Sequence, residues 1–276
     1  MSLSNESRSL IERLRPVIES TSAQDLTRHI ESEEYSSFRD ETLALAHEGS
    51  FRAFFAPFDW INEAADVVIV GVTPGRQQAL EALLAMHAAF RSGHSIDEAA
   101  RQAKSAASFK GGMRTLGARL MDHFNLHKIF GLNSSIDLFG KAAARAHYTS
   151  VLRYPVLKDF KNYSGDKKIA VRNFMHRMID SCFAPELASL PNAWIVPFGP
   201  TAHLALESLA SRGLISSERI LGGILHPSGT QWNRYNVQLD LVSREKAVDV
   251  SGGQEVLRRS DALRAKVKSI LSAGVS

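Results

Sequence analysis

The chain has 276 residues, of which 44% are hydrophobic and 22% are charged, a composition that predicts a folded globular protein and excludes disordered and collagen-like chains. The single cysteine, Cys182, excludes an intrachain disulfide, a cysteine-based zinc site and an iron–sulfur cluster. The formal net charge is +4, from 33 Lys and Arg against 29 Asp and Glu, and this value is too small to indicate a nucleic-acid partner by itself.

The sequence gives no sign of a membrane or secretory segment. No apolar run approaches the roughly 18 residues that span a bilayer. The N-terminal segment carries charges where a secretory signal has a continuous apolar core. We therefore expect a cytoplasmic protein with no membrane partner.

The first half of the chain is predicted to be mostly helical, with one clear strand. Apolar residues recur at helical spacing within 6–50. A strand is predicted at 66–71, because its near-continuous β-branched run suits a strand that is covered on both faces. An Ala-rich stretch at 76–107 is predicted as helix with a turn near Gly93, and a further helix runs through 116–124.

The second half alternates strands and helices. In chain order we predict a strand at 148–152 ended by Pro155, a charged loop to about 168, a helix through Phe174, Met178 and Ile179, a strand at 193–199, a helix at 201–209, a short apolar strand at 220–225 and a C-terminal helix over about 254–272.

This alternation predicts a three-layer α/β/α fold with a central, mainly parallel four-stranded sheet and extra N-terminal helices. We expect a single domain over 1–276, made of an N-terminal helical extension at 1–58, a core at 59–245 and a C-terminal helix in 246–276. In such a sheet, ligands bind outside the carboxyl ends of the strands. Polar, turn-rich segments follow predicted strands at 71–78, 149–155 and 226–236.

The first of these segments has the sequence Gly-Val-Thr-Pro-Gly at 71–75, between a strand and a helix. Its glycines allow close backbone approach, and the N-terminus of the helix offers N–H groups to an anion. It matches neither a dinucleotide-binding nor a P-loop pattern. An ordinary strand-to-helix turn is the alternative interpretation.

The last segment begins His-Pro-Ser-Gly at 226–229, directly after an apolar strand. His226 and Ser228 present hydrogen-bond donors at the edge of the sheet. A structural histidine is the alternative interpretation. Ser228 does not lie in a Gly-x-Ser-x-Gly elbow, so we do not predict an acyl-transfer nucleophile.

Together the two motifs resemble the signature motifs of the uracil-DNA glycosylase superfamily. Three other segments are similar, in order and spacing, to the thermostable bacterial and archaeal branch: Ser-Phe-Lys-Gly-Gly at 108–112, Tyr-Thr-Ser-Val-Leu-Arg-Tyr-Pro at 148–155 and Phe-Gly-Pro-Thr-Ala at 198–202. The resemblance spans about 60–240, and the N-terminal helices, the 76–107 insertion and the last helix lie outside it.

The resemblance implies a fold that extrudes a DNA base into a pocket and stabilises the negative charge of the leaving base. It implies that Phe109 stacks on the base, that His226 donates to a base carbonyl oxygen and that Thr73 holds a water at the sugar. Gly71, Val72 and Ser150 are expected to line the base pocket. Contacts to phosphate or DNA are expected from Pro74, Gly75, Arg76, Arg153, Ser228, Gly229, Trp232 and Arg234.

Two positions depart from the pattern of the superfamily. Thr73 stands where active members usually have Asp, Asn or Ala, and a threonine hydroxyl cannot act as a base near neutral pH. Ser150 aligns with the Asn that reads the pyrimidine edge. The sequence therefore predicts weak discrimination of uracil or a different ligand. The iron–sulfur cysteines of the thermostable branch are missing as well.

The segment Thr-Gln-Trp-Asn-Arg-Tyr-Asn at 230–236 follows the second motif. In the superfamily this segment inserts an apolar wedge into the duplex. Trp232, Arg234 or Tyr235 is suited to that role or to stacking on an unpaired base. The alternative is that Trp232 packs into the core.

Charge and histidine patterns add two further expectations. Residues 141–177 hold nine Lys and Arg against two Asp, which fits either phosphate contacts or a solvated basic face.

His123 and His127 are four residues apart on a predicted helix, but the Glu of a zinc-binding His-Glu-x-x-His motif is absent and no third ligand is evident. We expect no metal and no cofactor.

Three functions remain open from the sequence. The first is a DNA glycosylase of altered specificity that acts on damaged or deaminated bases in single- or double-stranded DNA. The second is a non-catalytic module that binds nucleic acid, a nucleotide or a nucleobase, and Thr73 and Ser150 favour it. The third is hydrolysis of a small N-glycoside such as a nucleoside.

Overall fold

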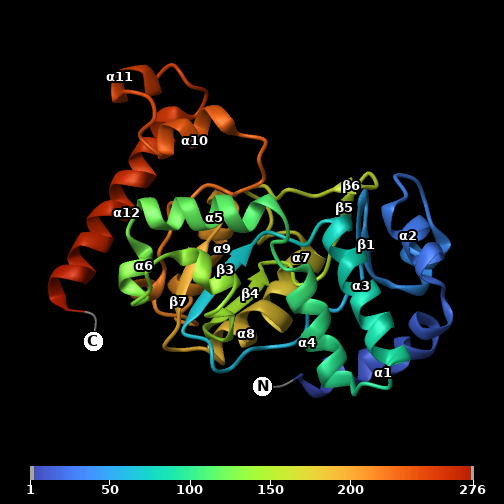
Figure 1. The fold of residues 1–276 in the computed structure, drawn as a ribbon. Helices are drawn as coiled ribbons and strands as arrows, with labels where there is room; N and C mark the ends of the chain where they lie inside the picture. The colour runs from blue at the N-terminus through green and yellow to red at the C-terminus, as the bar shows by residue number, and fades with distance from the viewer. Residues whose placement is uncertain (1–2, 275–276) are drawn as a thin grey trace. The chain divides into compact units, whose positions relative to one another are not determined.

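The computed structural model describes residues 3–274, which form a mixed α/β fold with more helix than strand. Its strands make two sheets (Figure 1). The first is a parallel sheet in the order β4 (Ala146–Ser150), β3 (Val67–Gly71), β7 (Trp194–Pro197). Three of the four predicted strands are therefore confirmed in type, with bounds shifted by one or two residues.

The predicted fourth parallel strand at 220–225 is wrong. Only Ile220 forms a β-bridge, to Ile195, although the backbone of this segment still runs beside β7. Gly222 and Gly223 explain the difference, because Gly223 has a φ of +133° and glycine weakens a strand interior. An irregular segment thus stands where a fourth strand was expected.

A second sheet, antiparallel and unforeseen in the sequence analysis, has the order β1 (Ala44–Glu48), β2 (Phe51–Phe54), β5 (Val156–Lys158), β6 (Lys161–Asn162). The helix predicted over 6–50 is therefore wrong beyond Thr42, and the loop predicted to 168 contains a hairpin. Gly49, with a φ of +58°, turns β1 into β2, as a tight hairpin requires.

The helices agree better with their predictions. They are α1 (Asn5–Ser20), α2 (Ala23–Glu31), α3 (Arg76–Arg91), α4 (Ile96–Ala107), α5 (Gly112–His123), α6 (Leu126–Ile129), α7 (Asn173–Met178), α8 (Ala184–Ala188), α9 (Pro200–Ser211), α10 (Trp232–Gln238), α11 (Arg244–Ala247) and α12 (Gly253–Ala273). Short π- or 3₁₀-helical segments lie at Phe38–Thr42, Ser135–Phe139, Ala143–Arg145, Ile179–Phe183 and Ser217–Arg219. Within the described residues, no helix is both long and apolar enough to cross a membrane.

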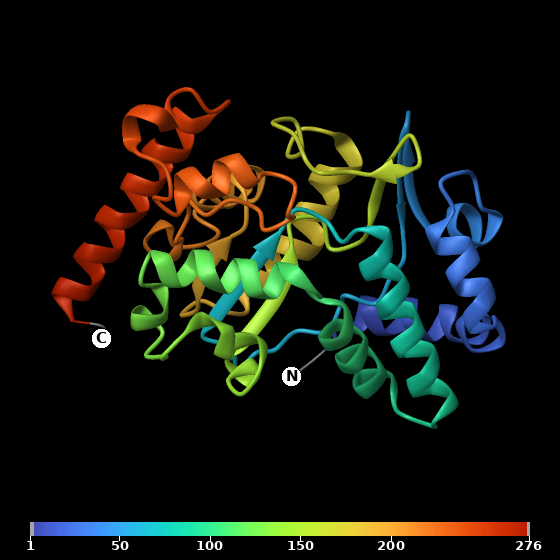
Figure 2. The same ribbon diagram turned by 45° about the horizontal axis from the view of Figure 1, so that its top comes forward.

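The chain groups into two compact units. Unit 1 comprises the residues up to Glu63, Val72–Lys110 and Tyr148–Ser189, and unit 2 comprises Ala64–Gly71, Gly111–His147 and the residues from Leu190 onward. In unit 1, α3 packs against α4, α2 and α1 (Figure 2). In unit 2, α12 packs along α10 and α6 (Figure 1).

A glycine in unit 2 allows a helix to lie directly on the end of a strand. A Cβ atom at Gly117 of α5 would stand 2.8 Å from the ring of Phe198, which follows β7. Real Cβ atoms do not approach ring carbons this closely, so α5 can pack here only because glycine has no side chain at position 117.

Candidate functional site

The predicted site residues from Val72 to Arg153 belong to unit 1, and Gly71 and the residues from His226 to Arg234 belong to unit 2. Gly71 ends β3, Val72 follows it, and both are buried. Pro74 is buried as well, and Ser150 is half-buried at the end of β4.

Thr73 connects the first motif to the segment that follows β4. Its hydroxyl donates to the carbonyl oxygen of Tyr154 at 3.0 Å and accepts from the N–H of Val156 at 3.1 Å. The hydroxyl therefore has two protein partners, whereas the resemblance implies that it holds a water at the sugar. This position holds two backbone segments together.

Replacing Thr73 with Val is expected to lower the free energy of unfolding by about 1–3 kcal/mol, because a carbonyl and an N–H lose their partner in a partly buried place. Thr73→Ser keeps the hydroxyl and serves as the matched control, expected to retain most of the stability. Urea denaturation measures both variants. Equal transition midpoints for Thr73→Val and the wild type would contradict the structural role.

The N-terminus of α3 is occupied by groups of unit 1. The N–H of Gly75 donates to Oε1 of Gln78 at 3.1 Å, and the N–H of Arg76 donates to Oδ1 of Asn162 at 2.9 Å. The Arg76 guanidinium, only 13% exposed, pairs with Glu33 at 2.9 Å. It also donates to the backbone carbonyl oxygens of residues 31 and 32. The predicted phosphate contacts at 75–76 thus have protein partners instead.

Phe109 has a backbone that bulky residues rarely adopt. Its φ is +48°, and its ring is buried edge-on to Tyr148 with the ring centroids 6.2 Å apart. A positive φ at a side chain of this size is strained and persists only where the surroundings impose it. The loop therefore holds this ring in one place.

Arg153 lies inside unit 1, in a network of four charges with Asp59, Lys104 and Glu186. Arg153 pairs with Glu186 at 2.9 Å and lies 3.7 Å from Asp59. Lys104 pairs with Glu186 at 3.1 Å and donates to the carbonyl oxygen of Trp60 at 2.7 Å. The prediction that Arg153 contacts phosphate is therefore wrong, because its charge is buried and balanced within the protein.

Two hydroxyl groups outside the four charges donate to one carboxylate oxygen of Asp59. Its Oδ1 accepts from the hydroxyls of Ser7 at 2.8 Å and Tyr154 at 2.6 Å, while Oδ2 is buried with no hydrogen-bond partner among the described residues. Burial raises the pKa of Asp59 and lowers the pKa of Lys104. Sequence reasoning missed Asp59, Lys104 and Glu186 altogether.

His226 of unit 2 has a fixed backbone and an unengaged ring. Its carbonyl oxygen accepts from the hydroxyl of Tyr235 at 2.6 Å, and a Cβ at Gly199 would stand 3.1 Å from its Cβ. Burial lowers the pKa of His226, so the imidazole is neutral near pH 7. No described residue hydrogen-bonds to its ring nitrogens. The ring can therefore donate to or accept from a ligand.

The segment after His226 has one exposed aromatic side chain. Trp232 begins α10, is 59% exposed and meets Tyr235 edge-on with the ring centroids 5.6 Å apart. The alternative that Trp232 packs into the core is therefore wrong, and residues 232–238 are helix. Ser228 is exposed, and its hydroxyl lies 3.0 Å from that of Thr230. Gly229 has a φ of +74°.

The guanidinium of Arg234, which was predicted to contact DNA, has protein partners instead. Nε of Arg234 donates to the carbonyl oxygen of Ser251 at 2.8 Å, and NH1 donates to Oε1 of Gln231 at 3.2 Å. This guanidinium therefore anchors α10 to the loop before α12.

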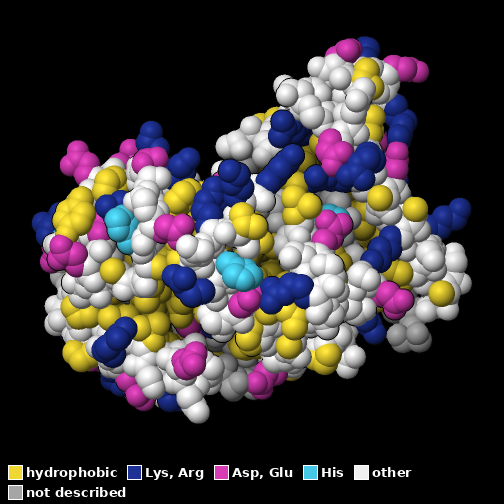
Figure 3. Space-filling model, turned by 180° about the vertical axis from the view of Figure 1, so that it is seen from behind, with side chains coloured by type: hydrophobic (Ala, Val, Ile, Leu, Met, Phe, Trp, Pro, Cys, Tyr) yellow, Lys and Arg dark blue, Asp and Glu magenta, His cyan; other side chains and the backbone are white. Residues whose placement is uncertain are grey.

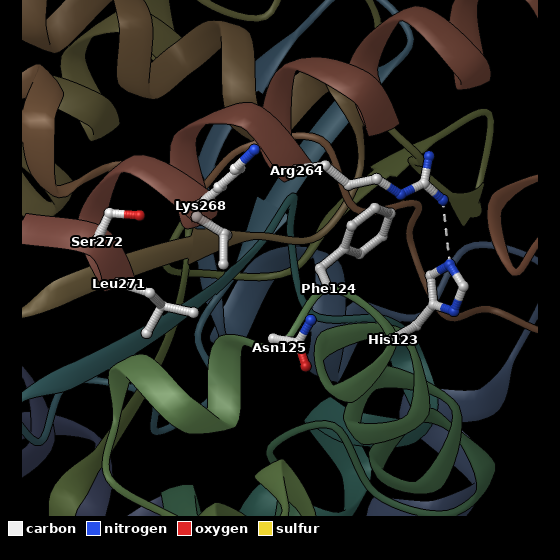
Figure 4. A pocket seen from close by; sticks show the side chains of 8 residues that line it. His123, Phe124, Asn125, Arg264, Lys268, Leu271 and Ser272 are labelled. Atoms are coloured by element: carbon white, nitrogen blue, oxygen red, sulfur yellow. Dashed lines mark hydrogen bonds between the residues drawn. The ribbon is translucent and has the colours of Figure 1, made fainter.

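His123 lines a shallow cavity of about 440 Å³ together with residues of α12 (Figure 4). Its Nε2 lies 3.1 Å from Asp240 and 3.2 Å from Arg264, and the dashed line in Figure 4 marks the contact with Arg264. Nδ1 of His127 lies 3.3 Å from Asp122. In the part of the chain that the structure describes, no three His, Cys, Asp or Glu side chains are grouped to hold a metal ion.

The nine cations of 141–177 divide into two sets. Four pair with carboxylates: Lys141 with Asp137, Arg145 with Asp66, Arg153 with Glu186 and Arg172 with Asp166. The other five, Lys158, Lys161, Lys167, Lys168 and Arg177, are exposed and form no ion pair with any described residue. Figure 3 shows a similar mixture, with many Lys and Arg beside Asp or Glu on the face it displays.

Comparison with known proteins adds one relative. The chain is 30% identical over 202 residues, covering 72% of this chain and 79% of the other, to the uncharacterized protein YoxB of Bacillus subtilis (strain 168). No protein-family model matches the chain, and no solved structure matches it.

Proposed function

Because this chain belongs to the same protein family as YoxB of Bacillus subtilis, whose name states no activity, we propose its function from the chemistry of its site. We propose a DNA-binding protein of the glycosylase type, which takes a base out of a strand and stabilises it as a leaving group through His226. The proposal includes the three-layer α/β/α fold of the uracil-DNA glycosylase superfamily, which the motifs at 71–75 and 226–229 resemble.

The observation that carries this proposal is the state of the His226 ring. It is half-buried, it is neutral near pH 7, and its nitrogens have no partner among the described residues. A neutral imidazole N–H in a poorly hydrated place is suited to donate to a base carbonyl oxygen. That donation becomes stronger as negative charge develops on the departing base, so it favours cleavage of the N-glycosidic bond.

Two aromatic residues support the same function. Trp232, exposed six residues after His226, is suited to fill the space of an extruded base or to stack on an unpaired one. The resemblance assigns base stacking to Phe109, and the strained backbone at this residue supports a specific role for its ring.

A second candidate is a module that binds the base without cleaving the bond. The occupied hydroxyl of Thr73 favours it, because its one proton is already donated to Tyr154 and a hydroxyl cannot act as a base near neutral pH. Both candidates share the base-binding role of His226 and differ only in the chemistry that follows.

The experiment is a panel of single- and double-stranded oligonucleotides that carry uracil, hypoxanthine, xanthine or a thymine mismatch. Each is incubated with the purified chain and treated with alkali, and its Kd is measured beside that of an unmodified oligonucleotide. Abasic product on one substrate is the expected result. Tighter binding of a modified oligonucleotide without product selects the second candidate. Neither product nor preferential binding on any substrate contradicts both.

A further inference from the structure

The β5–β6 hairpin of unit 1 places two lysines directly opposite each other. Lys158 pairs in register with Lys161, across a two-residue turn formed by Asp159 and Phe160, whose φ angles are +49° and +58°. Residues that are directly opposite share one face of a sheet, and like charges in that arrangement repel. Neither lysine forms an ion pair with any described residue, so no carboxylate pairs with either charge.

The line of residues paired across β6 and β5 continues onto β2. Phe51 pairs in register with Lys158, so its ring lies on the face of the two lysines. The Arg172 guanidinium stands 4.7 Å from the centre of this ring, and Nζ of Lys158 stands 5.7 Å from it. Tyr163 meets the ring edge-on with the centroids 5.5 Å apart. Cations thus surround the aromatic ring on this face.

Apart from the exposed Asp159 of the turn itself, few carboxylates lie near these charges. Asp166 is occupied by Arg172 at 2.7 Å, and Glu48, at the β1 end of this line of residues, accepts from the N–H of Phe174 at 3.3 Å. The exposed Lys167 and Lys168 follow Asp166 directly in the chain. An anion between Lys158 and Lys161 would convert their repulsion into attraction to a common partner.

The hairpin is also joined to the first motif. Asn162 of β6 accepts from the N–H of Arg76 and lies against Gly75. A nucleic-acid strand bound at the hairpin is therefore close to Gly75 and Arg76, for which the resemblance implies contacts to phosphate or DNA.

We propose that this antiparallel sheet, through Lys158 and Lys161, binds the phosphodiester backbone of a nucleic acid without regard to sequence. The identity of that nucleic acid as DNA rests on the proposed function. An anionic membrane fits less well, because membrane attachment needs an exposed apolar face. The ring at the hairpin tip, Phe160, instead lies under the guanidinium of Arg52, 4.6 Å from its centre.

The test compares Lys158→Gln/Lys161→Gln with Lys128→Gln/Lys268→Gln. The control pair replaces two exposed lysines of unit 2 that likewise form no ion pair within the described residues. Fluorescence anisotropy measures the Kd of unmodified single-stranded DNA at several KCl concentrations. For the hairpin variant we expect a loss of about 25-fold at 0.1 M salt and a slope of log Kd against log salt shallower by about 1.4, since each phosphate contact contributes about 0.7. The control should bind as the wild type does.

Several outcomes would overturn the proposal. Wild-type affinity in the hairpin variant, or an equal loss in both variants, would mean that the sheet is not the contact surface. Unchanged DNA binding with lost binding to vesicles of phosphatidylcholine and phosphatidylserine would assign the lysines to a membrane. The ratio of Kd values for modified and unmodified DNA should be the same in the hairpin variant and the wild type. A wild-type ratio of one would contradict the proposed function and leave a hairpin-dependent loss standing.

Discussion

Replacing Glu186 with Ala is expected to lower the free energy of unfolding by about 3–5 kcal/mol. The side chain is fully buried and bonds to both Lys104 and Arg153, so its removal leaves two cations with one remaining carboxylate, Asp59. An uncompensated charge in a poorly hydrated interior is costly, because the charge has lost its water without gaining a partner. Urea denaturation followed by circular dichroism measures the change.

Two further variants make this result interpretable. Glu186→Gln keeps the size and hydrogen-bonding oxygen but removes the charge, and we expect a smaller loss than for Ala. Glu19→Gln removes a half-exposed pair of α1, in which Glu19 accepts from Arg15 at 3.1 Å, and should change stability by less than about 0.5 kcal/mol. Equal effects of Glu186→Ala and Glu19→Gln would show that the buried charges are dispensable.

Replacing His226 with Ala is expected to remove the preference for modified over unmodified DNA and to slow any base release by about 10²–10³-fold. The ring nitrogens of His226 have no hydrogen-bond partner among the described residues, so the loss of the imidazole should weaken ligand binding more than it lowers stability. Kd ratios and single-turnover rates on the substrate selected by the panel measure the effect. His226→Gln keeps an N–H donor and should retain part of the activity.

The matched control for this variant is His203→Ala. His203 lies on α9 of the same unit, burial lowers the pKa of its imidazole too, and its ring lies 3.7 Å from Glu207. Its replacement should leave the Kd ratio unchanged. If the two histidine variants behave alike, or if His226→Ala binds and cleaves as the wild type does, His226 has no part in the site.

The parallel strands could be predicted because their sequences admit few other structures. Every residue of β3 is buried, which matches its unbroken β-branched run. β1 and β2 escaped prediction because they are only four or five residues long and follow apolar residues at helical spacing, and two of the five residues of β1 are Ala, which is depleted in strands. The segment at 220–225 has the apolar composition of a strand, yet its two glycines keep the backbone irregular.

The candidate site also has a part that could be predicted from the sequence and a part that could not. Gly71–Gly75 and His226–Gly229 could be located from sequence, since each motif follows a strand or its irregular equivalent. The charge network could not be predicted, because Lys104 and Glu186 are 82 residues apart and no local spacing links them. One signal was present: Lys104 is a charged residue on the buried face of an Ala-rich helix.

The charge network of unit 1 also bears on how sequences of this family diverge. Two positive and two negative side chains cancel in its interior, so a substitution at one of the four positions leaves a deficit that a second position must correct. Asp59, Lys104, Arg153 and Glu186 should therefore be inherited as a block, kept together or exchanged together. A homologue's residues at these four positions would reveal whether it has the same interior before its structure is known.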